Sequence, residues 1–378
     1  MKDIRIAWLL PTAWFYWHPV LSHFAKIFPQ ARVFTALWPG FAKGYEDSFP
    51  VEIVGENRFV APKRETTGYS RGFTFLSPNI IIRLLQYKPD LIFADSFRIW
   101  SLFALLLKPF CAWRVILSYE GSSPTVDYRN SPLRLFLRRL MVRAADAYMT
   151  NSQTGKAYLV EVLGAKEELV FARPYEVPDA QSLLSNSTTS VQVPEAKKPI
   201  FLFVGHLVPR KGLLLLLQAC QQLNKQGCQD YTLWIVGDGE ERKAAEMFIQ
   251  ANDLQEQVKL LGKLDYNCLG SYFQAADAFV LPTLEDTWGM VVLEALLFGT
   301  PVLCSQWAGA AELITNGENG YVFDPYHPEQ LAELMSYFVK NSEQIKKMGE
   351  KSKQTMTSHT PIAASVTLAK IVESLCGV

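Results

Sequence analysis

Two basic residues that follow a glycine turn form the first pattern able to do chemistry. Gly205 follows the apolar run at 200–204, and Arg210 and Lys211 precede a leucine-rich segment of helical character. The start of a helix presents free backbone N–H groups and the positive end of the helix dipole, which together attract anions. Arg210 and Lys211 add full charges that can contact phosphate oxygens. The pattern favours a phosphate-binding turn, and the alternative is a solvated basic turn before a helix.

A second glycine turn, at Gly237 and Gly239, follows the apolar run at 232–236. It contains only half of the G-x-G-x-x-G dinucleotide fingerprint, so it gives weak support for NAD binding. Because glycine has no side chain, the backbone at such a turn can approach another group closely. We expect a close approach of this kind at Gly237.

Acidic residues follow the apolar run at 278–281. Glu285 and Asp286 come first, and Gly289 then opens an apolar helix that contains a further carboxylate, Glu294. A carboxylate on an apolar helix face is costly unless a polar partner binds it, and the hydroxyls of a sugar or ribose would serve. A role in capping a neighbouring turn is the alternative.

Asp286 and Glu294 could also be the carboxylate pair of a glycoside hydrolase. Along a helix their Cα atoms would lie about 12 Å apart, at about 1.5 Å per residue. The paired carboxyl groups of hydrolases lie roughly 5–9.5 Å apart. This spacing and the phosphate-like turn make hydrolysis the less favoured interpretation.

Short apolar runs alternate with longer amphipathic segments along most of the chain, which is typical of βα units that build parallel sheets. The expected strands are residues 4–10, 32–37, 90–94, 114–118, 147–150, 169–172, 200–204, 232–236, 259–261, 278–281, 301–304 and 321–323. The expected helices are residues 19–27, 78–86, 99–106, 133–144, 155–163, 213–223, 240–251, 268–275, 291–298 and 328–339. Ligands of such sheets bind beyond the carboxyl ends of the strands, so we expect functional residues there.

The length of 378 residues favours two domains, because a single apolar core stops growing at roughly 250–300 residues. A polar, Ser/Thr-rich stretch bounded by prolines between 178 and 199 is typical of a linker. We therefore expect two Rossmann-like parallel-sheet domains facing a central cleft. The predicted divisions are a first domain at 1–178, a linker at 179–199, a second domain at 200–357, and a last helix at 358–378 that packs back on the first domain.

Composition and charge argue against several function classes. Lys+Arg and Asp+Glu both number 37, yet residues 1–180 carry a net charge of +6 and residues 181–378 one of −6. The basic residues form no recognisable reader motif, so we expect no nucleic-acid partner. The six cysteines contain no C-x-x-C pair, which favours reduced core thiols in a cytoplasmic protein over a zinc site or a disulfide framework. The N-terminus resembles a strand and predicts no cleavable signal peptide.

A membrane-spanning helix is not expected, because Lys108, Pro109 and Arg114 interrupt the most apolar stretch, 99–117. The segment 132–144 instead suits peripheral binding to an anionic membrane surface, on the inner face of a membrane. Its arginines and leucines alternate at helical spacing and include Arg134, Arg138, Arg139, Leu133, Leu137 and Leu140. An aromatic cluster could stack on sugars or meet the same membrane, and it comprises Trp14, Phe15, Tyr16 and Trp17. Ordinary packing on the sheet is the alternative for both.

Five motifs in order resemble those of the family 4 retaining glycosyltransferases, which have the two-domain GT-B fold. The motifs are residues 204–212, 236–239, 286–295, 298–302 and 309–312, and the match runs from about 201 to 338. The resemblance implies a hexosyltransferase without a cofactor. No D-x-D occurs at a plausible metal position, so we expect it to be metal-independent. It would move a sugar from a UDP- or GDP-sugar to a lipid-linked or polysaccharide acceptor, with retention of anomeric configuration. The first half is similar to the family mainly in the rhythm of its elements.

The resemblance assigns a role to the charged residues of the second half. Lys211 matches the lysine that holds the donor diphosphate, and Glu294 matches the glutamate that binds the ribose. Asp286 stands where the family has a glutamate that contacts the donor sugar. His206 replaces an arginine that usually follows the glycine, and Arg210 can compensate for the lost charge.

Further donor contacts and one acceptor-side residue are implied in the same way. The backbone at Gly205, Gly237, Gly289, Met290 and Val291 would approach the phosphates or the sugar, and Lys263 and Leu264 would touch the nucleobase. Asp95 stands where the family usually has a catalytic histidine at a strand end, and it would take over that role or cap the next helix. The changes at positions 206 and 286 keep a second hypothesis open, a non-catalytic module that binds nucleotide-sugars.

Overall fold

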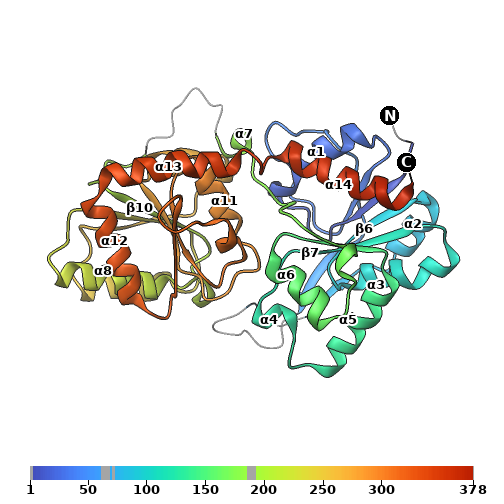
Figure 1. Ribbon diagram of the computed structural model, residues 1–378, viewed down its shortest axis with the longest axis horizontal. Helices are drawn as coiled ribbons and strands as arrows, with labels where there is room; N and C mark the ends of the chain where they lie inside the picture. Colours follow the sequence, from blue (N-terminus) through green and yellow to red (C-terminus); the bar gives the residue numbers. More distant parts are fainter. Residues whose placement is uncertain (1–2, 61–68, 70–72, 185–192, 378) are drawn as a thin grey trace. The chain divides into compact units, whose positions relative to one another are not determined.

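The computed structural model describes residues 3–60, 69, 73–184 and 193–377 (Figure 1). The chain divides into two compact units. Unit 1 comprises Met1–Arg64, Ser70–Val177 and His359–Val378, and unit 2 comprises Glu65–Tyr69 and Pro178–Ser358.

Unit 1 is built on a seven-stranded parallel sheet with the strand order β3-β2-β1-β6-β7-β8-β9. Its strands are β1 (Ile6–Leu9), β2 (Arg32–Thr35), β3 (Val51–Ile53), β6 (Leu91–Asp95), β7 (Arg114–Tyr119), β8 (Ala147–Thr150) and β9 (Val170–Ala172). A separate antiparallel pair joins β4 (Asn57–Val60) to β5 (Phe73–Leu76). β1 and β8 are buried along their whole length, as expected where helices cover both faces of a parallel sheet.

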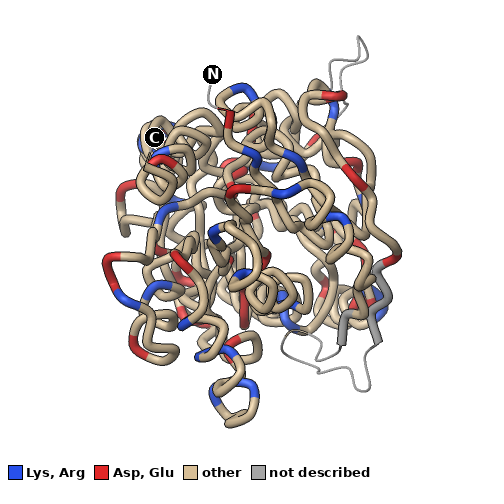
Figure 2. The backbone as a smooth tube through the Cα atoms, turned by 90° about the vertical axis from the view of Figure 1, so that its right-hand side faces the viewer, with Lys and Arg blue, Asp and Glu red and all other residues tan. Residues whose placement is uncertain are grey.

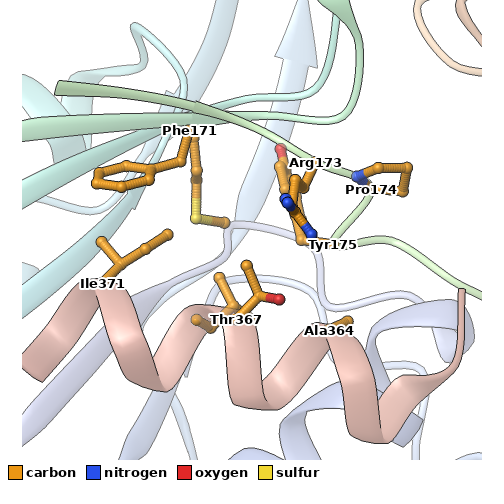
Figure 3. Close-up of a pocket in the computed structure, with 9 residues that line it drawn as sticks. Phe171, Arg173, Pro174, Tyr175, Ala364, Thr367 and Ile371 are labelled. Carbon is orange, nitrogen blue, oxygen red and sulfur yellow. The ribbon is translucent and has the colours of Figure 1, made fainter. Parts of the chain in front are cut away.

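Helices cover the unit 1 sheet, and one of them comes from the C-terminus. They are α1 (His18–Ile27), α2 (Ile80–Tyr87), α3 (Ile99–Leu107), α4 (Pro124–Asp127), α5 (Pro132–Ala144), α6 (Gln153–Ala157) and α14 (Pro361–Cys376). α14 lies alongside α1, the first helix of the chain (Figure 1). Thr367 and Ile371 of α14 face Phe171 and Arg173 across a recess of about 10 Å³, which is too small for a substrate (Figure 3).

Unit 2 is built on a six-stranded parallel sheet with the order β12-β11-β10-β13-β14-β15. Its strands are β10 (Ile200–Val204), β11 (Thr232–Val236), β12 (Val258–Gly262), β13 (Ala278–Leu281), β14 (Val302–Ser305) and β15 (Gly320–Phe323). Its helices are α7 (Ala180–Leu183), α8 (Leu213–Lys225), α9 (Arg242–Ala251), α10 (Leu269–Ala275), α11 (Met290–Leu297), α12 (Pro328–Lys340) and α13 (Ser342–Met356). The strand order reverses between β10 and β13, and ligands of open parallel sheets bind beyond the carboxyl ends at such a reversal.

The prediction of two parallel α/β sheets is confirmed, while several elements differ from the sequence expectation. β3 is an edge strand of three residues, and α13 carries few apolar residues, so neither produced a clear periodic signal. The helix predicted at 155–163 is instead α6 followed by a π-helical turn, because the Leu163 amide bonds the Tyr158 carbonyl five residues earlier. The predicted linker contains α7, and its residues 185–192 lie outside the described part.

Basic and acidic positions are interspersed along the backbone (Figure 2). Among the described helices, none is both long enough and apolar enough to cross a membrane.

Candidate functional site

The loops that follow β10 and β13 are joined through their backbones at the reversal of the unit 2 sheet. The carbonyl of Arg210 accepts hydrogen bonds from the Leu284 amide at 2.8 Å and the Thr283 hydroxyl at 3.0 Å. Gly212 has a φ of 67°, and a Cβ there would lie 2.0 Å from the Pro282 carbonyl oxygen. Only glycine fits this close approach, so the sequence at Gly212 determines how the basic turn meets the acidic loop.

Asp286 forms ion pairs with both basic residues of the turn. Its Oδ2 contacts Nζ of Lys211 and lies 3.8 Å from the Arg210 guanidinium. The residue is only 7% exposed. Burial would raise the pKa of the Asp286 carboxyl, but the charges of Lys211 and Arg210 hold it below its ordinary value. The acid predicted to contact the donor sugar is therefore ionised and bound to the cations predicted to hold the phosphates.

Tyr69 also belongs to this cluster, although no sequence pattern predicted it. Its hydroxyl donates to Oδ1 of Asp286 at 3.1 Å and accepts from the Thr287 amide at 3.2 Å. The Arg210 guanidinium carbon stacks 4.0 Å from the centre of the tyrosine ring. Burial and the Asp286 charge raise the pKa of Tyr69, so its hydroxyl stays a proton donor. No motif surrounds Tyr69. It lies 217 positions from Asp286 in the sequence, and only the tertiary structure brings the two side chains together.

Glu294 lies inside α11 and is 3% exposed. Its Oε1 accepts a hydrogen bond of 3.0 Å from the Tyr266 hydroxyl. Burial raises the pKa of Glu294 to about 7, and the Tyr266 hydrogen bond opposes that rise. Glu294 is therefore partly ionised near neutral pH. In its ionised form the carboxylate can accept hydrogen bonds from ligand hydroxyls. Tyr266 was not a predicted site residue, since nothing in its neighbourhood forms a motif.

The other predicted donor contacts follow the carboxyl ends of the unit 2 strands. Gly237 has a φ of 142° and lies close to Gly205. A Cβ on Gly237 would lie only 1.9 Å from the carbonyl oxygen of Gly205. His206 is exposed after β10, and after β12 Lys263 is exposed and Leu264 half-buried. Gly289 precedes α11, whose first residues, Met290 and Val291, are half-buried. The carbonyl of the buried Glu285 accepts a hydrogen bond of 2.9 Å from Arg210.

Asp95 belongs to unit 1, at the end of β6. Its carboxylate pairs with Arg98 at 2.9 Å, and burial raises its pKa although Arg98 opposes the rise. Its predicted role stays a prediction. Among the described residues, no group of three or more His, Cys, Asp or Glu side chains is arranged to hold a metal ion.

Comparison with known proteins finds one family that the second half resembles. Residues 187–355 match the family described as Glycosyl transferases group 1. The match covers somewhat less than half of the chain and includes the basic turn, the acidic loop and α11. The resemblance noted from the ordered motifs is thereby confirmed, and those motifs lie within the matched range.

Curated proteins that resemble this chain match it over part of their length. An uncharacterized glycosyltransferase of Methanocaldococcus jannaschii, MJ1178, is 29% identical over 153 residues, which are 40% of this chain and 42% of MJ1178. The sulfoquinovosyl transferase SQD2 of Arabidopsis thaliana is 25% identical over 300 residues, covering 74% of this chain and 55% of SQD2. The chain thus spans about half the length of these curated relatives.

The crystal structure of HepE from Anabaena in complex with UDP superposes with a TM-score of 0.74 at 17% sequence identity. The superposition covers 98% of this chain and 100% of the HepE chain. This likeness shows that the two parallel sheets form the GT-B fold.

Proposed function

We propose that the protein is a retaining, metal-independent hexosyltransferase that moves a sugar from a nucleotide-diphosphate sugar to a hydroxyl of an acceptor. The observation that carries the proposal is the cluster of Lys211, Arg210 and Asp286 at the reversal of the unit 2 sheet. Two fixed cations beside a buried carboxylate suit a ligand that combines a diphosphate with sugar hydroxyls. The match of residues 187–355 to the Glycosyl transferases group 1 family supports the same reaction class.

Each residue of the cluster has a task in this reaction. Lys211 and Arg210 stabilise the negative charge that develops on the diphosphate when the bond between the anomeric carbon and the phosphate oxygen breaks. The acceptor oxygen attacks the anomeric carbon on the same face, and its proton passes to the departing phosphate oxygen. Asp286 accepts hydrogen bonds from hydroxyls of the transferred sugar, while Glu294 accepts them from the ribose.

The cations are paired with Asp286 before a donor binds, so a diphosphate competes with this carboxylate for them. The paired state keeps Lys211 in place without leaving a buried charge uncompensated. A nucleotide-sugar donor offers a new partner to each side of the ion pair: its diphosphate binds the cations, and its sugar hydroxyls bind Asp286. This exchange favours a complete nucleotide-sugar over inorganic phosphate.

UDP-sugars are the first donors to test, with GDP-sugars second. HepE, which shares the fold, has been crystallised with UDP-glucose. A thermal-shift screen with UDP, GDP and their sugars identifies the ligand that binds the native state, because such a ligand raises its apparent stability. Radiolabelled transfer or slow donor hydrolysis that persists in EDTA supports the proposal. Tight binding without any turnover supports the non-catalytic module instead.

The proposed acceptor is lipid-linked or a polysaccharide, met at the cytoplasmic, anionic face of a membrane. α5 exposes Leu133 by 69% and Phe136 by 57%, and Leu137 and Leu140 are exposed beside them. Arg139 is exposed on the same helix, so apolar and cationic groups share this surface. Asp95, at a strand end of the same unit, is the proposed acceptor-side residue.

Two members of the predicted membrane and aromatic patterns are core residues instead. Arg138 is buried and donates to the Asp127 carbonyl at 3.0 Å and the Tyr158 hydroxyl at 2.8 Å. Trp17 is buried against Tyr175, with ring centroids 5.4 Å apart. The two predictions used only residue type and spacing in the sequence. Whether a side chain is buried depends on the elements that pack against it, so the sequence pattern did not indicate the burial of these two residues.

Sedimentation with anionic vesicles tests the membrane part. Phe136→Ser should reduce binding to phosphatidylglycerol vesicles at low salt, because it removes exposed apolar area from α5. Met247→Ser is the matched control, since Met247 is 71% exposed on α9 of unit 2. Equal binding by both variants, or no binding by the unaltered protein, would contradict the membrane proposal.

A further inference from the structure

Among the described residues, Tyr266 donates a hydrogen bond to the buried carboxyl of Glu294. The hydroxyl oxygen of Tyr266 lies 3.0 Å from Oε1 of Glu294. Burial and the nearby Glu294 charge raise the pKa of Tyr266, so its hydroxyl remains protonated. An ionised carboxylate can only accept, and the tyrosine is therefore the donor. This bond engages Oε1, and within the described part of the chain no further hydrogen bond reaches the carboxyl, which leaves Oε2 for a ligand.

The position of Tyr266 is set by tight packing around it. It begins the short turn at Tyr266–Cys268 that leads into α10. A Cβ on Gly270 of α10 would lie 2.7 Å from the Leu183 carbonyl oxygen of α7, so the two helices touch through their backbones. The hydroxyl of Ser182, on α7, also hydrogen-bonds the Tyr266 side chain. The phenol is thus held from two sides, which is what a group that orients another requires.

We propose that Tyr266 is a positioning residue that orients Glu294 so that its Oε2 accepts hydrogen bonds from the ribose hydroxyls of the nucleotide. The inference rests on the proposed function, because the ribose is assigned to Glu294 there. It adds a residue outside the family's motifs and gives it a defined role: Tyr266 fixes one carboxylate oxygen and keeps the other aimed at the ligand.

The same hydrogen bond controls the charge of Glu294. Tyr266, from the turn before α10, is the titratable group that bonds the carboxyl. The charge of Asp179 acts on Tyr266 and adds to the rise of its pKa. Tyr266→Phe removes a donor that stabilises the ionised form, so the pKa of Glu294 rises further. Ribose binding that needs the ionised carboxylate is then lost at a higher pH than in the unaltered protein.

Calorimetric affinities for UDP and 2′-deoxy-UDP, measured from pH 6 to 8.5, test the inference; GDP and 2′-deoxy-GDP replace them if the thermal-shift screen selects guanine. A hydrogen bond to a charged group is worth roughly a tenfold change or more in affinity, so the unaltered protein should bind UDP roughly tenfold tighter than the deoxynucleotide. In Tyr266→Phe the discrimination should fall to roughly threefold, and the pH midpoint of UDP binding should move upward. Tyr272→Phe is the matched control, because it removes a phenol hydroxyl from a buried tyrosine of the adjacent helix α10.

Each outcome has a separate meaning. If the unaltered protein does not distinguish UDP from its deoxy form, the ribose role of Glu294 in the proposed function is wrong. If it does, and Tyr266→Phe keeps both the discrimination and the midpoint, the inference is overturned. A loss of affinity that is equal for both nucleotides also overturns it, since it indicates a structural role. 3-Fluorotyrosine placed at position 266 keeps the shape and strengthens the donor, so it should move the midpoint downward even if the phenylalanine variant fails to fold.

Discussion

Lys211 and Asp286 form an ion pair between two loops that are 75 positions apart in the sequence. The loops follow β10 and β13, the two neighbouring strands between which the order of the unit 2 sheet reverses. The pair places a cation and a buried carboxylate at the point where open parallel sheets bind ligands. It also explains why a basic turn is stable in the acidic half of the chain, since local partners compensate its charge.

Replacing the lysine should abolish transfer while leaving the fold intact. Lys211→Ala removes a cation placed to meet the developing phosphate charge, and the loss of one such group costs roughly 100- to 1,000-fold in rate. Radiolabelled sugar transfer measures this change. Lys225→Ala, at the exposed end of α8, is the control and should keep the rate. Near-normal transfer by Lys211→Ala would remove the lysine from the proposed site.

Neutralising Asp286 should lower the stability of the protein but strengthen its binding of the diphosphate. Asp286→Asn leaves Lys211 and Arg210 without their buried counter-charge, so the free energy of unfolding should fall by about 3 kcal/mol. The nucleoside diphosphate then meets unpaired cations, and its stabilising effect in thermal unfolding should exceed that in the unaltered protein. Asp230→Asn, an exposed change in the same unit and outside the five motifs, should show neither effect. A smaller ligand effect in Asp286→Asn would contradict competition between Asp286 and the diphosphate.

The buried Glu294 should make stability fall as pH rises. Its pKa in the folded protein is about 7, above the ordinary value of 4.5, so the folded state holds the proton more tightly than the unfolded chain does. The resulting stabilisation is complete below the unfolded pKa and is lost as pH rises from there through about 7; it amounts to about 3 kcal/mol. Urea unfolding at pH 5 and pH 8 should show this loss, and Glu294→Gln should remove most of it. An unchanged pH slope in the variant would show that another group titrates.

A side chain at Gly237 should disrupt the donor site by steric conflict. Gly237→Ala would place a Cβ 1.9 Å from the Gly205 carbonyl oxygen, so the turn must move away from the phosphate-binding loop. We expect a loss of several kcal/mol in unfolding free energy and of nucleotide binding. Gly227→Ala has a positive φ of 74° but open space around it, so it should cost only about 1 kcal/mol. Equal losses in both variants would mean that backbone strain alone explains the effect.

The sequence by itself determined the fold class and predicted where the candidate site lies. Alternation of apolar and amphipathic segments predicted two parallel sheets, and the glycine turns after 200–204 and 232–236 identified strand ends. These features could be recognised because local periodicity and glycine geometry act over a few residues. The buried Glu294 on an apolar helix was recognisable for the same reason.

The tertiary structure decided which side chains meet and what state they are in. It placed Tyr69 on Asp286 and Tyr266 on Glu294, and it paired Asp286 with Lys211. None of these contacts joins sequence neighbours, so no spacing rule could indicate them. Burial likewise raised the pKa of Glu294 and moved Arg138 from an expected surface into the core. Both effects depend on the elements packed around a residue, whereas sequence pattern records only its type and position.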